Sequence, residues 1–136
     1  MKKIKEVIRI TGLSRRTLQY YDDCGLVKPN RTAENYRLYG EDELKRLWNL
    51  LIYKEMRFRL DEIAVLLDVS EEEVQSKLEA QLDRINHKIY DLERIRNLIK
   101  KVLEYGMPDV ISAERTVELS NYKDLVQRLA EKINRN

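Results

Sequence analysis

The spacing of apolar side chains near the N-terminus predicts two short helices. Residues 4–11 place apolar side chains at helical intervals between charged ones, and Gly12 predicts the end of that helix. Ser14 is a favourable N-cap for a second helix, which would turn Leu18 and Tyr21 inward. Two short helices joined by a glycine-containing turn make a helix-turn-helix, although this stretch alone also fits an ordinary pair of antiparallel helices.

The next segment has the pattern of a small β-hairpin. Residues 23–25 interrupt the helical pattern, and residues 26–29, which begin with two apolar side chains and end in a proline, are expected to be extended. Residues 30–35 predict a polar turn, and residues 36–39 have the composition of a strand. We therefore predict a wing, meaning a β-hairpin beside the helix-turn-helix.

Two further helices are expected after the wing. Three acidic residues follow Gly40, at a helix start where the helix dipole favours them. The apolar positions of this helix that we expect to pack inward are Leu44, Leu47, Trp48, Leu51 and Ile52. A shorter helix over about 60–68 would place Ile63, Leu66 and Leu67 on one side.

A long helix is predicted next, because Ser70 and Glu73 form a capping box and neither glycine nor proline follows before Gly106. Its length would be about 35 residues, or about 52 Å. Its apolar stripe comprises Val74, Leu78, Leu82, Ile85, Ile89, Leu92, Ile95, Ile99 and Val102. A small head cannot cover so long a stripe, so we expect a partner helix to do so. The alternative is that the chain's own tail folds back, but one short helix cannot cover nine positions.

The expected fold is mainly α, with three parts. Residues 1–69 form a winged helix-turn-helix head, residues 70–105 a coiled-coil dimerisation helix, and residues 106–136 a tail with one short helix. The dimerisation residues are Leu78, Leu82, Ile85, Ile89, Leu92, Ile95 and Ile99. The tail helix is expected from Thr116 to Arg135, with apolar positions that include Val117 and Leu119.

Charge is distributed unevenly along the chain. Residues 1–60 carry 14 basic and 8 acidic side chains, whereas residues 61–136 carry 12 and 16. A basic half joined to an acidic half suggests a head that binds a polyanion. Cys24 is the only cysteine, which rules out an internal disulfide and fits a reducing compartment. With no apolar run of membrane-spanning length and no apolar signal stretch after Met1, we expect a soluble cytoplasmic protein.

The outer face of the second helix carries side chains of the types that bind phosphates and base edges, so we expect it to read duplex DNA. Arg15 and Arg16 lie in its first turn, where a recognition helix reaches base edges in the major groove, and Gln19 follows one turn later. Arginine can pair bidentately with guanine, and glutamine with adenine. We expect one of Tyr20 and Tyr21 to contact a phosphate and the other to pack inside. Each arginine could instead be an ordinary solvated charge.

The wing carries a further cation: Arg37 would meet a phosphate or the minor groove.

Chemistry other than DNA binding is poorly supported. His87 lies among charged neighbours, and Cys24 has no second ligand at metal-binding spacing. Neither a glycine-rich phosphate loop nor a nucleophile with a histidine partner is visible, so we expect no enzyme activity, no cofactor and no metal site.

Several of these segments match one known pattern in order and spacing. They are residues 12–22, 25–29, 35–39, 44–55 and 60–63. On these motifs the chain resembles the MerR family of transcription regulators over about residues 2–105. Residues 51–55 and 60–68 look most like its TipA-like, multidrug-responsive branch.

The resemblance implies a homodimer joined by an antiparallel coiled coil, which binds double-stranded promoter DNA and distorts it so that RNA polymerase can use the promoter. It maps recognition-helix contacts onto Thr17, Gln19, Tyr20 and Tyr21, wing contacts onto Arg37 and Tyr39, and a backbone contact onto Lys54.

The chain departs from the family pattern at Gln19, Ile8 and Arg57, where arginine, a small residue and glycine are usual. Arg57 would add a cation at a backbone cost if a left-handed conformation is needed there. Cysteines after the long helix are absent, so metal sensing is not expected, and with about 30 residues after the coiled coil we do not expect the large effector domain of drug-sensing members. These residues do not indicate which small molecule would act as an inducer. An alternative function is a helical dimeric interaction protein whose tail binds a protein partner and whose DNA binding is weak.

Overall fold

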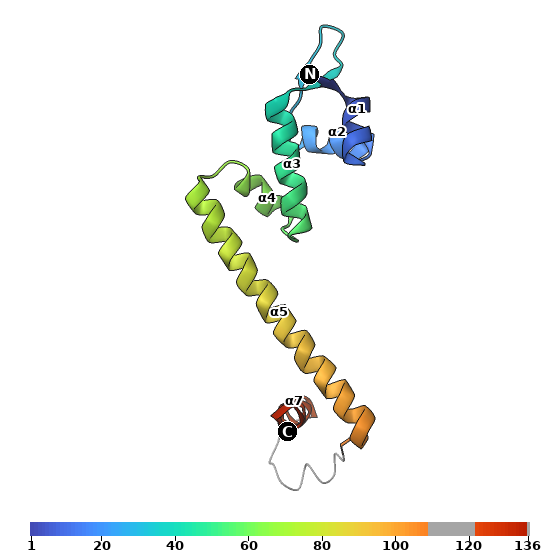
Figure 1. Ribbon diagram of the computed structural model, residues 1–136, viewed down its shortest axis with the longest axis vertical. Helices are drawn as coiled ribbons and strands as arrows, with labels where there is room; N and C mark the ends of the chain where they lie inside the picture. Colours follow the sequence, from blue (N-terminus) through green and yellow to red (C-terminus); the bar gives the residue numbers. More distant parts are fainter. Residues whose placement is uncertain (109–121, 136) are drawn as a thin grey trace. The chain divides into compact units, whose positions relative to one another are not determined.

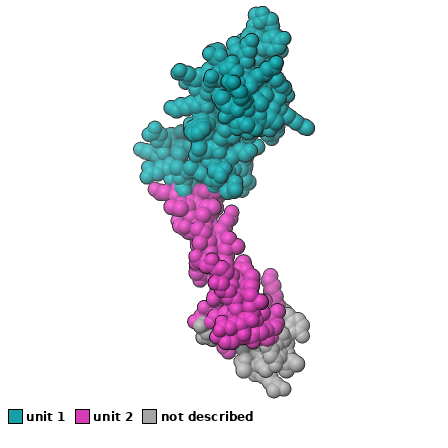
Figure 2. Space-filling view, turned by 45° about the vertical axis from the view of Figure 1, so that its right-hand side comes forward, with its two compact units in different colours: residues 1–78 teal, residues 79–136 magenta. Residues whose placement is uncertain are grey.

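The computed structural model describes residues 1–108 and 122–135. The chain divides into two compact units, residues 1–78 and 79–136, which are coloured separately in Figure 2. All of the sequence-predicted head lies in the first unit, and most of the long helix lies in the second.

The first unit is mainly helical with a small sheet, as the sequence predicts. Its elements are β1 (Lys2–Lys3), α1 (Ile4–Thr11), α2 (Arg15–Asp23), β2 (Asn30–Arg31), β3 (Arg37–Tyr39), α3 (Glu41–Glu55), α4 (Leu60–Leu66) and the start of α5 (Glu71–Tyr105) (Figure 1). The predicted turn between α1 and α2 is confirmed. Gly12 adopts a left-handed φ of 73° after α1, and the Ser14 hydroxyl accepts a hydrogen bond of 3.0 Å from the Thr17 amide.

The wing is confirmed as a hairpin, but its first strand is not where the sequence placed it. Asn30 and Arg31 form β2, whereas Leu26 and Val27 are buried, and their amides donate to the Tyr21 carbonyl oxygen. Those two side chains are apolar because they belong to the core. A third strand, β1, pairs with β3 and completes an antiparallel sheet of order β1-β3-β2. Two residues are too few to show a strand pattern, so β1 was missed.

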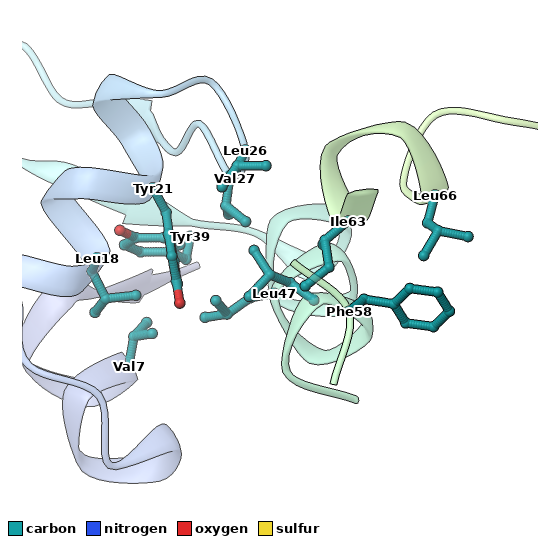
Figure 3. Close-up of a cluster of buried hydrophobic side chains, with 11 residues drawn as sticks. Val7, Leu18, Tyr21, Leu26, Val27, Tyr39, Leu47, Phe58, Ile63 and Leu66 are labelled. Atoms are coloured by element: carbon teal, nitrogen blue, oxygen red, sulfur yellow. The ribbon is translucent and has the colours of Figure 1, made fainter. Parts of the chain in front are cut away.

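One hydrophobic core holds the helices of the first unit to its sheet. Figure 3 shows the buried side chains converging from α1, α2, β3, α3 and α4. They are Val7, Leu18, Tyr21, Leu26, Val27, Tyr39, Leu47, Leu50, Phe58, Ile63 and Leu66. The prediction for Trp48 and Ile52 was wrong, because they are 64% and 38% exposed. Leu50 is buried instead, since the inner face of α3 is rotated from the one that the spacing indicated.

Arg46 links three segments of the first unit through its guanidinium group. From α3 it donates to the carbonyl oxygen of Leu26, in the loop after α2, and to that of Leu67, at the end of α4. It also binds both carboxylate oxygens of Asp68, at 2.7 and 3.1 Å. The side chain is 29% exposed, so these carbonyl contacts are partly shielded from water.

Arg57 lies in the tight turn between α3 and α4 with a positive φ of 69°. The sequence predicted a backbone cost there if this conformation was needed, and the structure shows that conformation. A residue with a Cβ costs about 1–2 kcal/mol in the left-handed conformation. Glycine avoids this strain, but it loses more conformational entropy on folding, so only part of that energy is gained by a change to glycine.

Replacing Arg57 with glycine is therefore expected to raise the free energy of unfolding by about 0.5–1 kcal/mol. Arg57→Ala is the matched control, because it removes the same charge and keeps the Cβ. Chemical denaturation of the three proteins measures the effect. Equal stabilisation by alanine and glycine would show that charge, not backbone strain, sets the cost.

The long helix has the predicted extent. The Ser70 hydroxyl accepts from the Glu73 amide at 3.3 Å, and Gly106 follows Tyr105 with a φ of 85°. The tail helix, α7 (Tyr122–Arg135), occupies most of its predicted range, while residues 116–121, with Val117 and Leu119, lie outside the described residues. Within the second unit, Asn97 of α5 donates to Asn134 of α7 at 2.6 Å.

Candidate nucleic-acid interface

The outer face of α2 presents polar side chains to solvent. Arg15 and Arg16 are exposed in its first turn, and Gln19 is half-buried one turn later. Thr17 is also half-buried, and its hydroxyl lies 2.9 Å from the Ser14 hydroxyl. Since Leu18 and Tyr21 anchor the opposite face, the helix holds these side chains on one side of a packed scaffold.

The two neighbouring tyrosines have different environments. Tyr20 is 52% exposed, and a hydrogen bond with Cys24 raises the pKa of its hydroxyl above its usual value. Tyr21 is only 2% exposed. This agrees with the expectation that one of the two tyrosines packs inside, and the ring of Tyr21 does so because it lies on the same face of α2 as Leu18. The DNA contact that the resemblance implied for Tyr21 does not fit a side chain so buried.

Lys54 extends the basic surface from α2 to the end of α3. Its ammonium group donates to the Tyr21 hydroxyl at 3.3 Å, which places two predicted site residues together from distant parts of the sequence. Lys54 is otherwise exposed, and the exposed Arg57 follows in the next turn. An exposed ammonium group beside a recognition helix can bind a backbone phosphate.

Arg37 does not have the free guanidinium group that the sequence suggested. Its Nε donates to the Asp22 carboxylate at 2.8 Å, and its side chain is only 17% exposed. Arg31 binds the same oxygen at 3.1 Å and is 39% exposed. The sequence analysis assigned no role to Asp22 or Arg31. The only sign of this contact in the sequence is an acidic residue, Asp22, in a basic segment. The two arginines that bind Asp22 lie 9 and 15 residues further along the chain, too far for a local pattern to indicate them.

Tyr39 also requires a correction. The resemblance implied a wing contact, but the side chain is completely buried in the core beneath the sheet (Figure 3). Burial raises the pKa of its hydroxyl, which has no hydrogen-bond partner among the described residues. Because alternate side chains of β3 point to opposite faces of the sheet, the Tyr39 side chain packs between the wing and the core.

The apolar stripe of α5 is exposed along most of its length. Its most exposed members are Leu82, Ile89, Leu92, Ile95 and Ile99, at 49–65% exposure, and Ile85 is half-buried. Leu78 differs, because with Val74 it packs against the core of the first unit. The surface that a partner helix could cover therefore begins at Leu82. Among the described residues, no helix combines the length and apolarity needed to cross a membrane.

Known proteins that are similar to this chain are helix-turn-helix regulators, in agreement with the arrangement of α1 and α2 described above. The sequence profile of MerR HTH family regulatory proteins matches residues 2–69, half of the chain. The HTH-type transcriptional activator Mta of Bacillus subtilis is 35% identical over 102 residues, and the activator TipA of Streptomyces coelicolor is 32% identical over 102. Each alignment covers 74% of this chain but only 40% of the relative.

A solved structure of a transcriptional activator is also similar to this chain in fold and sequence. The N-terminal part of the Bacillus subtilis multidrug transporter activator, MtaN, matches with a TM-score of 0.69 and 35% identity. The match covers 76% of this chain and 98% of MtaN. Similarity to Mta and TipA supports the TipA-like branch that the motifs indicated. The chain belongs to the MerR family of helix-turn-helix transcription regulators.

Proposed function

We propose that this chain is a homodimeric transcription regulator that binds promoter DNA sequence-specifically through α2 and distorts it. The observation that carries the proposal is the polar outer face of α2, held rigidly by Leu18 and Tyr21 and flanked by Lys54. Arginine and glutamine there have the donor geometry to read base edges. The relatives named above are transcriptional activators, which supports the same function.

Dimerisation would come from the exposed stripe of α5. Five large apolar side chains at about half exposure or more are costly to leave in water, and a second copy of the helix offers a matching surface. An antiparallel pairing of two such rods would fix the separation of two recognition helices. Binding both half-sites could then store energy in bent and untwisted DNA, which would align the promoter for RNA polymerase. Such a regulator would act in the cytoplasm.

Arg16 and Lys54 are expected to contribute to binding in different ways. Arg16→Ala should lower affinity for the preferred duplex by about 10-fold, with a smaller effect on unrelated sequences, because one base contact is worth about 1–3 kcal/mol. Lys54→Ala should weaken binding to all sequences by a similar factor and reduce the salt dependence by about one ion.

Electrophoretic mobility shift at several salt concentrations would measure both effects, using a duplex that the wild-type protein selects from a random pool. An equal loss by both variants on every duplex would contradict this division of roles. Failure of the wild-type protein to select any duplex would favour the alternative, a dimeric interaction protein.

A further inference from the structure

Asp22 joins the recognition helix to both strands of the wing. It lies in the last turn of α2, with only 10% of its side chain exposed. One carboxylate oxygen, Oδ2, accepts hydrogen bonds from Arg37 in β3 at 2.8 Å and from Arg31 in β2 at 3.1 Å. A carboxylate so shielded from water is stable only when it is paired, so this contact constrains where the wing can lie relative to α2.

The two arginines need this shared partner. Arg31 and Arg37 lie directly opposite each other in the β2–β3 ladder. Like charges at opposed positions of a hairpin repel each other. Asp22 offsets one of the two positive charges, which leaves one net positive charge for the group.

That remaining charge is most accessible at Arg31. The Arg31 side chain is 39% exposed, compared with 17% for Arg37. A second nitrogen of Arg31 donates to the Asn35 carbonyl at 3.2 Å, so the guanidinium group is held at the base of the wing turn. An exposed and oriented guanidinium group is well suited to a phosphate oxygen.

We propose that Asp22 is a positioning residue for DNA recognition. It holds the wing at a fixed orientation to α2 and presents Arg31, not Arg37, to a backbone phosphate. The inference rests on the proposed DNA binding. Phosphate contacts set the register of a protein on its duplex, so loosening this joint lowers discrimination between sequences even when the protein remains folded.

Asp22→Asn tests the proposal because it keeps the shape of the side chain and removes its charge. Both arginines are then unmasked, so we expect stronger binding to a shuffled duplex and a salt dependence steeper by about one ion. The ratio of affinities for the selected and shuffled duplexes should fall by about 10-fold as the wing loses its fixed register. Asp22→Glu should restore part of that ratio.

Asp23→Asn is the matched control, because Asp23 is exposed in the same turn and the charge change is identical. It is expected to keep the wild-type ratio. Binding is measured by fluorescence anisotropy at several salt concentrations, well below the melting temperature of each variant, so that a loss of stability alone would not alter the ratio. Should Asp22→Asn fail to fold, Arg31→Gln serves instead and is expected to lower the salt dependence by about one ion on both duplexes.

A wild-type ratio and salt dependence in Asp22→Asn, or the same change in Asp23→Asn, would overturn the proposal for Asp22. An unchanged salt dependence in Arg31→Gln would overturn the role of Arg31. If the wild-type protein selects no duplex, the proposed function itself fails, which is a distinct result.

Discussion

Replacing Leu92 with aspartate is expected to convert the protein from a dimer to a monomer and to weaken binding to its selected duplex by at least about 100-fold. Leu92 is 65% exposed in the single chain and lies in the middle of the α5 stripe. In a paired rod it would be buried, and the symmetry of a homodimer would bury the new carboxylate twice. Losing the partner removes the second half-site and its effective concentration.

Sedimentation equilibrium at micromolar protein and anisotropy on the selected duplex would measure both effects. His87→Asp is the control, since His87 is exposed on the opposite side of α5 and the added charge is the same. It is expected to leave the dimer intact. A dimeric Leu92→Asp protein with wild-type affinity would rule out the stripe as the dimer interface.

Replacing Arg46 with alanine is expected to lower the free energy of unfolding by about 2–4 kcal/mol. The main cost is the loss of donors to the Leu26 and Leu67 carbonyl oxygens, which hold the loop after α2 and the end of α4 against α3. The ion pair with Asp68 adds less, because that carboxylate is 67% exposed and screened by water.

Thermal denaturation at a fixed protein concentration would measure the loss, because the stability of a dimer depends on concentration. Lys45→Ala is the control, since Lys45 is an exposed cation on the neighbouring position of α3. It is expected to change stability by less than about 0.5 kcal/mol. Equal destabilisation by the two variants would show that the Arg46 contacts contribute little.

Arg46→Ala is also expected to change how the free energy of unfolding depends on pH. The Arg46 hydrogen bond lowers the pKa of the Asp68 carboxyl group below its usual value. A lowered pKa in the folded state stabilises the protein above the unfolded pKa, and this stabilisation is lost as pH falls through the folded pKa. From about pH 4 downward the wild-type protein should lose stability more steeply than Arg46→Ala. Parallel decreases would contradict this coupling.

Much of the secondary structure could be predicted because its causes are local. The Ser14 cap and the left-handed glycines that follow α1 and α5 act within a few residues, and so does the helical pattern of α5, which no glycine or proline interrupts. The same holds for the exposed polar face of α2. The strand boundaries of the wing were less accurate, since Leu26 and Val27 are apolar for packing and not for pairing.

The amino-acid sequence by itself determined the order of the helices, the length of α5 and the polar outer face of α2, because periodicity and capping are properties of neighbouring residues. Only the tertiary structure decided that Tyr21 and Tyr39 are core residues, that Trp48 faces solvent, and that Arg37 is bound to Asp22. These outcomes depend on which surfaces meet across long sequence separations. A tyrosine or arginine has chemistry suited both to a phosphate and to an interior partner, so its role is set by the packing of segments distant in the chain.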